Sequence, residues 1–316
     1  MIRNLPPVVA ALALSVATAN AAEAVRYDLP PGSYPPDVAP AADGIVWYAD
    51  QMKGLLGGFD PETGKVTQIP LGAGSGPHGV IVGPEGGVWL TDGGQNAIVR
   101  VDPATKAVKV FPLPKEFANA NLNTAAFDGK GKLWFTGQSG VHGRVDPATG
   151  KVDAWRSPRP GSYGITSTPG GDVWFASLAG DYIGKVDTDT GAVTVVDPPR
   201  KGSGPRRIWS DSHGKLWVSF WNAGGIGRYD PEMKAWTVYS MPKSKSGTYA
   251  VYVDDKDRVW ATDWLANAIQ RFDPATEKFE TFPSDKRGAS VRQMLGRPGE
   301  TWGGESGNDR LVVVRD

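Results

Sequence analysis

Four carboxylates occupy equivalent places in a repeated segment and could together hold a divalent cation. Each lies three residues after a tryptophan, and they are Asp50, Asp92, Asp263 and Glu305. Carboxylate oxygens are the ligands that Mg²⁺ and Ca²⁺ prefer, and clustered acids also acquire the raised pKa values that suit acid–base work. We therefore predict a Mg²⁺ or Ca²⁺ site at these four residues. In the alternative, each carboxylate accepts backbone N–H bonds in the turn after its own strand.

A second set of side chains recurs near the start of the first strand of each repeat. From first repeat to last, the set is Pro36, His78, Asn123, Tyr163, Arg206, Tyr249 and Arg292. His78 is the best candidate for a proton acceptor, and Asp92 and Glu305 are the carboxylates that could assist it. We expect the substrate to be bound by Asn123, Tyr163, Arg206, Tyr249 and Arg292. A hydrogen-bonded structural histidine remains the alternative for His78.

Positive charge is expected beside these acids. Arg206, Arg207 and Arg292 fall on the same side of the repeats as the four carboxylates. A mouth of mixed charge could bind an anionic ligand next to a metal ion. The alternative is a solvated rim whose ion pairs are worth about 0–1 kcal/mol each.

Both sets are defined by an internal repeat of about 42 residues. One tryptophan marks each repeat at intervals of 40 to 45 residues, at Trp47, Trp89, Trp134, Trp174, Trp217, Trp260 and Trp302. An aspartate marks the end of a later strand, at Asp60, Asp102, Asp146, Asp187, Asp230, Asp273 and Asp316. Two independent markers that recur seven times with one period indicate a repeat architecture.

Each repeat is predicted to hold four short strands. In the second repeat we expect strands at 78–82, 87–91, 97–101 and 107–113, with an Asp-Pro turn at 102–106. Four strands in 40 to 45 residues are typical of a β-propeller blade. The fold class is therefore all-β, a seven-bladed propeller forming one domain over 23–316. The segment 24–30 resembles a fourth strand and is expected to complete the last blade, which removes an open sheet edge.

Composition supports this fold and excludes several function classes. Glycine is 41 and proline 26 of 316 residues, which disfavours long helices. The chain has 34 basic and 34 acidic residues and no cysteine. It therefore lacks the basic surface of a nucleic-acid-binding protein, and disulfides, thiolate metal sites and cysteine nucleophiles are excluded. We expect a monomer that binds a small molecule in the central funnel.

Residues 1–22 are interpreted as a cleaved signal peptide. Arg3 is followed by an apolar stretch from Leu5 to Ala19, and Ala19-Asn20-Ala21 has the small-residue pattern of a cleavage site. The apolar stretch is shorter than the roughly 20 residues that span a bilayer. We therefore expect a periplasmic or secreted protein without a membrane span.

Segments of several repeats carry a family resemblance. Gly76-Pro77-His78-Gly79-Val80, Gly87-Val88-Trp89-Leu90-Thr91-Asp92 and Tyr163-Gly164-Ile165-Thr166 resemble the blade consensus of the virginiamycin B lyase (streptogramin lyase) family. The resemblance covers essentially the whole chain after the leader. It implies a seven-bladed propeller, and an enzyme that opens a cyclic depsipeptide by β-elimination at an ester. It also implies Mg²⁺ and a histidine base with glutamate partners.

The sequence departs from the family's catalytic pattern in the later repeats. A Pro-His pair occurs once, at Pro77-His78, and the corresponding later positions carry Arg206, Tyr249 and Arg292. The resemblance nevertheless favours a metal-assisted carbon–oxygen lyase-like enzyme that acts on a cyclic ester or a related small molecule. Two alternatives stay open: a metal-dependent lactone hydrolase, and a propeller that binds a ligand or protein without catalysis.

Overall fold

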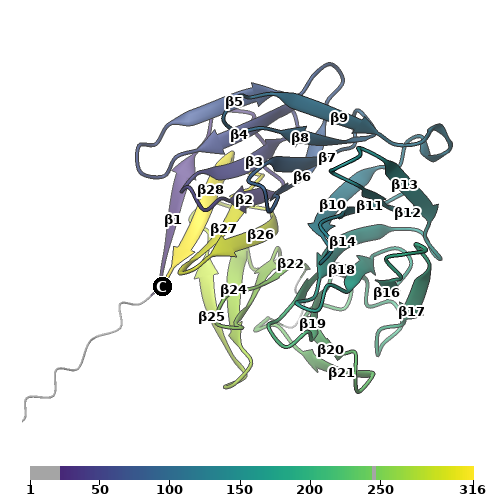
Figure 1. Ribbon diagram of the computed structural model, residues 1–316. Coiled ribbons are helices and arrows are strands. Elements are labelled where there is room, and N and C mark those ends of the chain that lie inside the picture. The colour runs from purple at the N-terminus through teal and green to yellow at the C-terminus, as the bar shows by residue number, and fades with distance from the viewer. Residues whose placement is uncertain (1–21, 244–246) are drawn as a thin grey trace, which may run out of the picture.

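The chain folds into a closed ring of β-sheets (Figure 1). The computed structural model describes residues 22–243 and 247–316. In these ranges the strands form seven four-stranded antiparallel sheets, and the helical structure is a single 3₁₀ turn, η1 (Lys115–Phe117). The predicted all-β, seven-bladed propeller is confirmed. The predicted signal peptide lies outside the described residues, apart from its last residue. Within the described ranges, no helix is long and apolar enough to cross a bilayer.

Each blade runs from an innermost strand at the ring axis to an outermost strand at the rim. Blade one holds β2 (Val38–Pro40), β3 (Val46–Asp50), β4 (Leu55–Phe59) and β5 (Val66–Pro70). Blade two holds β6 (Pro77–Val82), β7 (Val88–Asp92), β8 (Ala97–Val101) and β9 (Val108–Pro112). Blade three holds β10 (Leu122–Phe127), β11 (Leu133–Gly137), β12 (Val141–Val145) and β13 (Val152–Arg156). Blade four holds β14 (Ser162–Ser167), β15 (Val173–Ser177), β16 (Tyr182–Val186) and β17 (Val193–Val196).

The last three blades follow the same order. Blade five holds β18 (Pro205–Ser210), β19 (Leu216–Phe220), β20 (Ile226–Asp230) and β21 (Ala235–Tyr239). Blade six holds β22 (Thr248–Val253), β23 (Val259–Asp263), β24 (Ala268–Asp273) and β25 (Lys278–Pro283). Blade seven holds β26 (Val291–Arg297), β27 (Glu300–Glu305), β28 (Arg310–Arg315) and, from the start of the chain, β1 (Glu23–Asp28).

Blade seven closes the ring with strands from both ends of the chain. β1 pairs antiparallel with β28 over six residue pairs, from Glu23 opposite Arg315 to Asp28 opposite Arg310. Figure 1 shows these two strands side by side next to the C-terminus. The expectation that the N-terminal strand completes the last blade is therefore confirmed.

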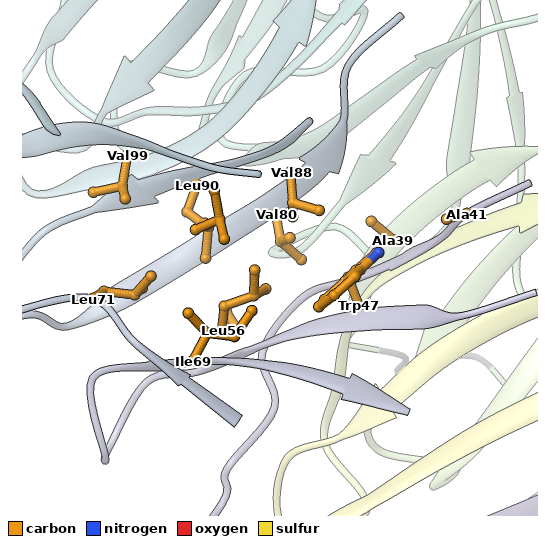
Figure 2. Packing of buried hydrophobic residues seen from close by; sticks show 12 residues of the cluster. Ala39, Ala41, Trp47, Leu56, Ile69, Leu71, Val80, Val88, Leu90 and Val99 are labelled. Carbon is orange, nitrogen blue, oxygen red and sulfur yellow. The ribbon is translucent and has the colours of Figure 1, made fainter. Parts of the chain in front are cut away.

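The hydrophobic core is divided into layers between neighbouring blades. The second strands are buried along their length because both of their faces meet adjoining sheets, whereas outer strands such as β9 are largely exposed. Figure 2 shows the layer between blades one and two, where Trp47, Leu56, Val80 and Leu90 interdigitate. Each of the seven repeated tryptophans belongs to one buried hydrophobic cluster of this kind.

The tryptophan indoles are also hydrogen-bonded to their own blades. In five blades the indole N–H donates to a carboxylate of the first hairpin, within 2.8–3.0 Å: Glu85, Asp128, Asp211, Asp254 and Glu300 accept from Trp89, Trp134, Trp217, Trp260 and Trp302. Blade four has Thr168 at the position of Asp128, six residues before its tryptophan. The buried indole N–H of Trp174 has no partner there.

A β-bulge interrupts the innermost strand of blades two to seven. The register with the second strand shifts between Pro77 and Val80 in blade two, and at the equivalent place in the next five blades. A bulge breaks the strict alternation of side chains. Two consecutive residues at the bulge can therefore approach the ring axis. Beyond the bulges, the innermost strands line an open cavity of about 400 Å³ on the opposite side of the ring.

Candidate functional site

Side chains from all seven blades meet at the ring axis, on the side where the innermost strands begin. Contacts that cross the ring show this directly, because Arg207 of blade five reaches Asp37 of blade one, and Tyr163 of blade four reaches Tyr249 of blade six. The backbones also come close: a Cβ added at Gly164 would lie 2.7 Å from the Cα of Arg207. Glycine at that position lets blades four and five approach each other at the axis.

The first part of this central cluster is built around Arg207. Its guanidinium donates to Asp37 Oδ1 at 2.9 Å and to the hydroxyl of Thr124, which in turn donates to Asn123 Oδ1 at 2.7 Å. His78 Nδ1 lies 3.9 Å from Asp37 Oδ1. Asp37 and Arg207 are 0% and 3% exposed, so this ion pair lies in a medium where charge interactions are strong.

The second part is built around two tyrosines. The hydroxyls of Tyr163 and Tyr249 lie 2.5 Å apart, and Arg206 donates to Tyr163 at 3.0 Å. The Arg206 guanidinium also lies 3.5 Å from the ring centre of Tyr249. Arg292 is 3.5 Å from the Tyr249 hydroxyl and bonds the hydroxyl of Tyr34. The Tyr249 hydroxyl is thus approached by hydrogen-bond donors on several sides.

The charges of the cluster change the proton affinity of His78 and Asp37. Burial, together with the nearby Arg207 and Arg292, lowers the pKa of His78 to about 3, against a hydrogen bond to the Asn123 backbone. Burial raises the pKa of Asp37 to about 6, although Arg207 and Arg292 oppose the rise. At neutral pH the imidazole is therefore uncharged and the carboxylate is mostly ionised.

The two tyrosines are affected in opposite directions. Burial, with Tyr249 beside it, raises the pKa of Tyr163 to about 12. Burial also acts on Tyr249, but Arg206, Arg207 and Arg292 together outweigh it and hold the pKa of this hydroxyl below its usual value. Either hydroxyl can donate in the bond between them, and loss of a proton from the pair would leave the phenolate on Tyr249 with Tyr163 as its donor.

Several buried polar atoms of the cluster lack a partner. Among the described residues these are Asp37 Oδ2, His78 Nδ1, Asn123 Nδ2, Arg206 Nε and Arg207 Nε. Leaving a buried polar group unpaired costs about 1–3 kcal/mol. Such groups concentrate where a protein keeps hydrogen-bonding capacity for a ligand or water, which identifies the cluster as the candidate site.

The four predicted metal ligands lie elsewhere, each in its own local hydrogen-bond network. Asp92 accepts from the Ser75 hydroxyl and from the amides of Gly76 and Gln95. Asp263 accepts from the Ala266 amide, and Asp50 accepts from Lys53, with its pKa raised by burial. The bonds from Lys53, Gln95 and Ala266 match the alternative in which each Asp caps the turn after its strand. The Oδ2 atoms of Asp50 and Asp263 are buried without a partner.

Glu305 belongs to an ion-pair network rather than to a turn. Its carboxylate accepts from Arg310 at 2.5 Å and 2.9 Å and from Arg26 at 3.2 Å. Over the described residues, no three His, Cys, Asp or Glu side chains are grouped so that they could hold a metal ion. The four carboxylates are thus not gathered into one ligand group within the described residues, and the Mg²⁺ or Ca²⁺ site stays a prediction.

The structure brings together the six polar residues of the set predicted at the starts of the first strands. The carboxylate next to His78, however, is not the predicted one. The expected partner was Asp92, whereas the carboxylate at 3.9 Å is Asp37. Asp37 and Thr124 were not among the predicted site residues, and Arg207 was predicted only as part of the positive charge beside the acids. All three directly follow a ring position, at Pro36, Asn123 and Arg206. In blades three and five the bulge turns both residues of a pair inward, and it could have been suspected from the successive polar pairs Asn123-Thr124 and Arg206-Arg207. Asp37 follows a proline and precedes β2, whose register with β3 is regular, so it carried no such signal.

Comparison with known proteins relates the whole propeller to one family. The model of the virginiamycin B lyase family matches residues 65–316. No curated protein sequence matches the chain. Virginiamycin B lyase from Staphylococcus aureus superimposes with a TM-score of 0.86 at 21% identity, covering 94% of this chain and 100% of that one.

Two further solved structures have the same fold. A structure described as a streptogramin B lyase gives a TM-score of 0.85 at 21% identity, over 93% of this chain and 97% of its own. A catalytically inactive variant of the Staphylococcus aureus lyase, solved with quinupristin, gives 0.86 at 22% identity, over 94% and 100%. At these identities the structural likeness establishes the fold.

Proposed function

The chain belongs to the virginiamycin B lyase family, and on that premise we propose that it is a carbon–oxygen lyase-like enzyme. Its substrate would be a cyclic ester or a related small molecule bound at the ring axis. We also propose that residues 1–22 direct export to the periplasm or the medium. The observation that supports a reaction at the axis is the central cluster, with its unpartnered buried polar atoms and its uncharged His78.

The proposed step is a β-elimination in which the ester oxygen leaves as a carboxylate. A base takes the proton from the carbon next to a carbonyl, and the C–H electron pair forms a carbon–carbon double bond. The C–O bond at the next carbon breaks, and its electron pair stays on the departing carboxylate. The product is an opened isomer of unchanged mass.

Residues of the central cluster can serve this step. His78 Nδ1 is unpartnered and the ring is neutral, so a lone pair can accept the proton. Asp37, 3.9 Å away, would stabilise the imidazolium that results. Arg206 and Arg292 would stabilise the negative charge that develops on the leaving carboxylate. Because the described carboxylates do not form a ligand set, no part of this step is assigned to a metal ion.

Product mass tests the proposal directly. Purified protein is incubated with a streptogramin B and with simpler cyclic esters, and the products are separated and weighed. We expect an isomer of unchanged mass, formed by the parent protein and by His213→Asn, whose exposed side chain lies far from the cluster, and lost in His78→Asn. Addition of one water would indicate a hydrolase and overturn the lyase proposal. Unchanged substrate in every incubation would also overturn it and favour a binding protein.

A further inference from the structure

We propose that the central cluster binds an anionic ligand, and that the carboxylate group of this ligand is held between Arg206 and Arg292. The inference names the substrate class of the proposed function and rests on the same site. It goes further than the elimination step because it requires an anion to bind before any bond is broken. The expected ligand is a carboxylic acid that also carries an apolar or aromatic group.

The cluster carries more positive than negative charge. Three guanidiniums, Arg206, Arg207 and Arg292, face the axis, and the one carboxylate that they contact among the described residues is Asp37, bonded to Arg207. Arg206 and Arg292 instead meet neutral groups, the hydroxyls of Tyr163, Tyr249, Tyr34 and Ser306. An excess of guanidinium charge in a poorly solvated place favours a bound anion.

Most of the unpartnered buried atoms in the cluster are hydrogen-bond donors. Arg206 Nε, Arg207 Nε and Asn123 Nδ2 carry N–H groups and are buried without an acceptor. A guanidinium and an amide can only donate through these nitrogens. Asn123 and Arg207 are 0% and 3% exposed. The group that would satisfy them is therefore an acceptor, and a carboxylate offers several lone pairs at once.

Aromatic side chains lie beside Arg206 and Arg292. Trp221 lies 4.4 Å from the Arg206 guanidinium, and Trp264 lies 5.0 Å from that of Arg292. The two indoles meet edge to face at 5.5 Å. Arg206, Arg292 and both tryptophans remain partly exposed, so a ligand can reach them from solvent. This surface would contact the apolar part of a ligand whose carboxylate meets the guanidiniums.

A bound anion would also act on His78. Arg207 and Arg292 are among the causes that hold the pKa of this imidazole low. A negative charge between the arginines offsets part of their effect, so the pKa of His78 should rise when the anion binds. A substrate of this class would thereby make the proposed base stronger, because a base works best when its pKa is closer to the operating pH.

The test uses phenylacetate and its uncharged analogue phenylacetamide, titrated into the purified protein at constant ionic strength. The chain has three histidines, so the ring signals of His78, His142 and His213 can be followed separately by nuclear magnetic resonance. We expect phenylacetate to bind at least tenfold more tightly than the amide and to shift the His78 signal. Either Arg206→Gln or Arg292→Gln should weaken phenylacetate binding about tenfold. The matched control is Arg228→Gln, because Arg228 lies over Trp217 and outside the cluster, and it should leave binding unchanged.

Equal affinity for acid and amide would overturn the inference, and so would an Arg228→Gln variant as weak as the two cluster variants. If one cluster variant fails to fold, the other decides the outcome together with the His78 signal. The result is independent of turnover: phenylacetate binding without any isomerised ester would support the anion site and reject the lyase proposal. Ester opening without tighter binding of phenylacetate than of phenylacetamide would support the lyase proposal and reject the anion site.

Discussion

The guanidinium of Arg207 and the carboxylate of Asp37 form a buried ion pair across the axis of the propeller. They lie 170 residues apart in the chain and 2.9 Å apart in space. The pair joins blade five to blade one, so it connects parts of the ring that share no sheet. It also borders His78 on one side and, through Thr124, Asn123 on the other. The geometry of the candidate site therefore depends on this pair.

Removing Asp37 should destabilise the fold strongly. In Asp37→Ala the guanidinium of Arg207 is left buried without its counter-charge, at an expected cost of about 3–5 kcal/mol in the free energy of unfolding. The measurement is urea denaturation followed by circular dichroism. The control is Asp189→Ala, which breaks an exposed pair with Lys130 and should cost about 0–1 kcal/mol. Similar losses in the two variants would contradict the account.

The stability of the protein should depend on His78 in acid. Its pKa is about 3 in the folded chain, against 6.5 for a free histidine side chain, so between these pH values the unfolded chain binds the extra proton. Stability therefore falls as the pH drops from about 6.5 to about 3. In His78→Asn this contribution, on the order of a few kcal/mol, should disappear, which unfolding midpoints at several pH values can check.

The control for that experiment is His213→Asn, because the His213 side chain is 79% exposed and its replacement should leave the slope unchanged. Asp37 acts in the opposite sense. Its folded pKa of about 6 lies above the 3.8 of a free aspartate side chain, so its contribution weakens folding as the pH rises from about 4 to about 6. An identical pH slope in the parent protein and in His78→Asn would refute the role given to the imidazole.

Tyr249 should ionise before the other buried tyrosines. Arg206, Arg207 and Arg292 lower the pKa of its hydroxyl, whereas burial raises the pKa of Tyr163 and Tyr252. An ultraviolet titration of phenolate absorbance should therefore lose its earliest step in Tyr249→Phe and keep it in Tyr252→Phe. Replacing Arg206 with Gln should move that step to higher pH. A Tyr249→Phe curve that overlays the parent curve would exclude the lowered pKa.

Blade four can be stabilised by a single substitution. Thr168 stands where blades three, five and six have an Asp that accepts from the tryptophan indole, and the Trp174 N–H is buried without a partner. Thr168→Asp should supply the acceptor and stabilise the fold by about 1 kcal/mol. The reciprocal change, Asp128→Ala, should destabilise blade three by about 1–3 kcal/mol. Urea midpoints check both, and a Thr168→Asp variant no more stable than the parent would contradict the interpretation.

The architecture could be predicted from sequence because its signals are repeated. One tryptophan and one aspartate per repeat define the period. A strand position that is ambiguous in one repeat can therefore be located by comparison with the other six. The closure of blade seven was predictable for the same reason, since the N-terminal segment has the pattern of a missing fourth strand. The positions of His78, Tyr163, Arg206, Tyr249 and Arg292 near the axis followed directly from the repeat.

The partners of these side chains were harder to predict. Strict alternation along a strand would point Thr124 and Arg207 away from the residues before them, and the bulge cancels that rule. Asp37 instead lies just before the innermost strand of blade one, which begins at Val38. The carboxylates illustrate a second limit. Asp92 and Asp263 stand where the sequence placed them, but Asp92 accepts from Ser75, Gly76 and Gln95, and Asp263 accepts from the Ala266 amide in the turn after its strand. Sequence alone does not say whether an oxygen is used locally or offered to a ligand.

The composition of blade seven has a consequence for the time course of folding. The strand at residues 23–28 can be paired only after residues 310–315 have been synthesised. At roughly 5–20 residues per second a ribosome needs about 15–60 s for this interval, during which β1 has no strand to pair with. Blades one to six are each contiguous in sequence and can form as they emerge. The closing of the ring is thus a late event that joins the first and last strands of the propeller, and β1 is the strand most exposed to incorrect pairing until then.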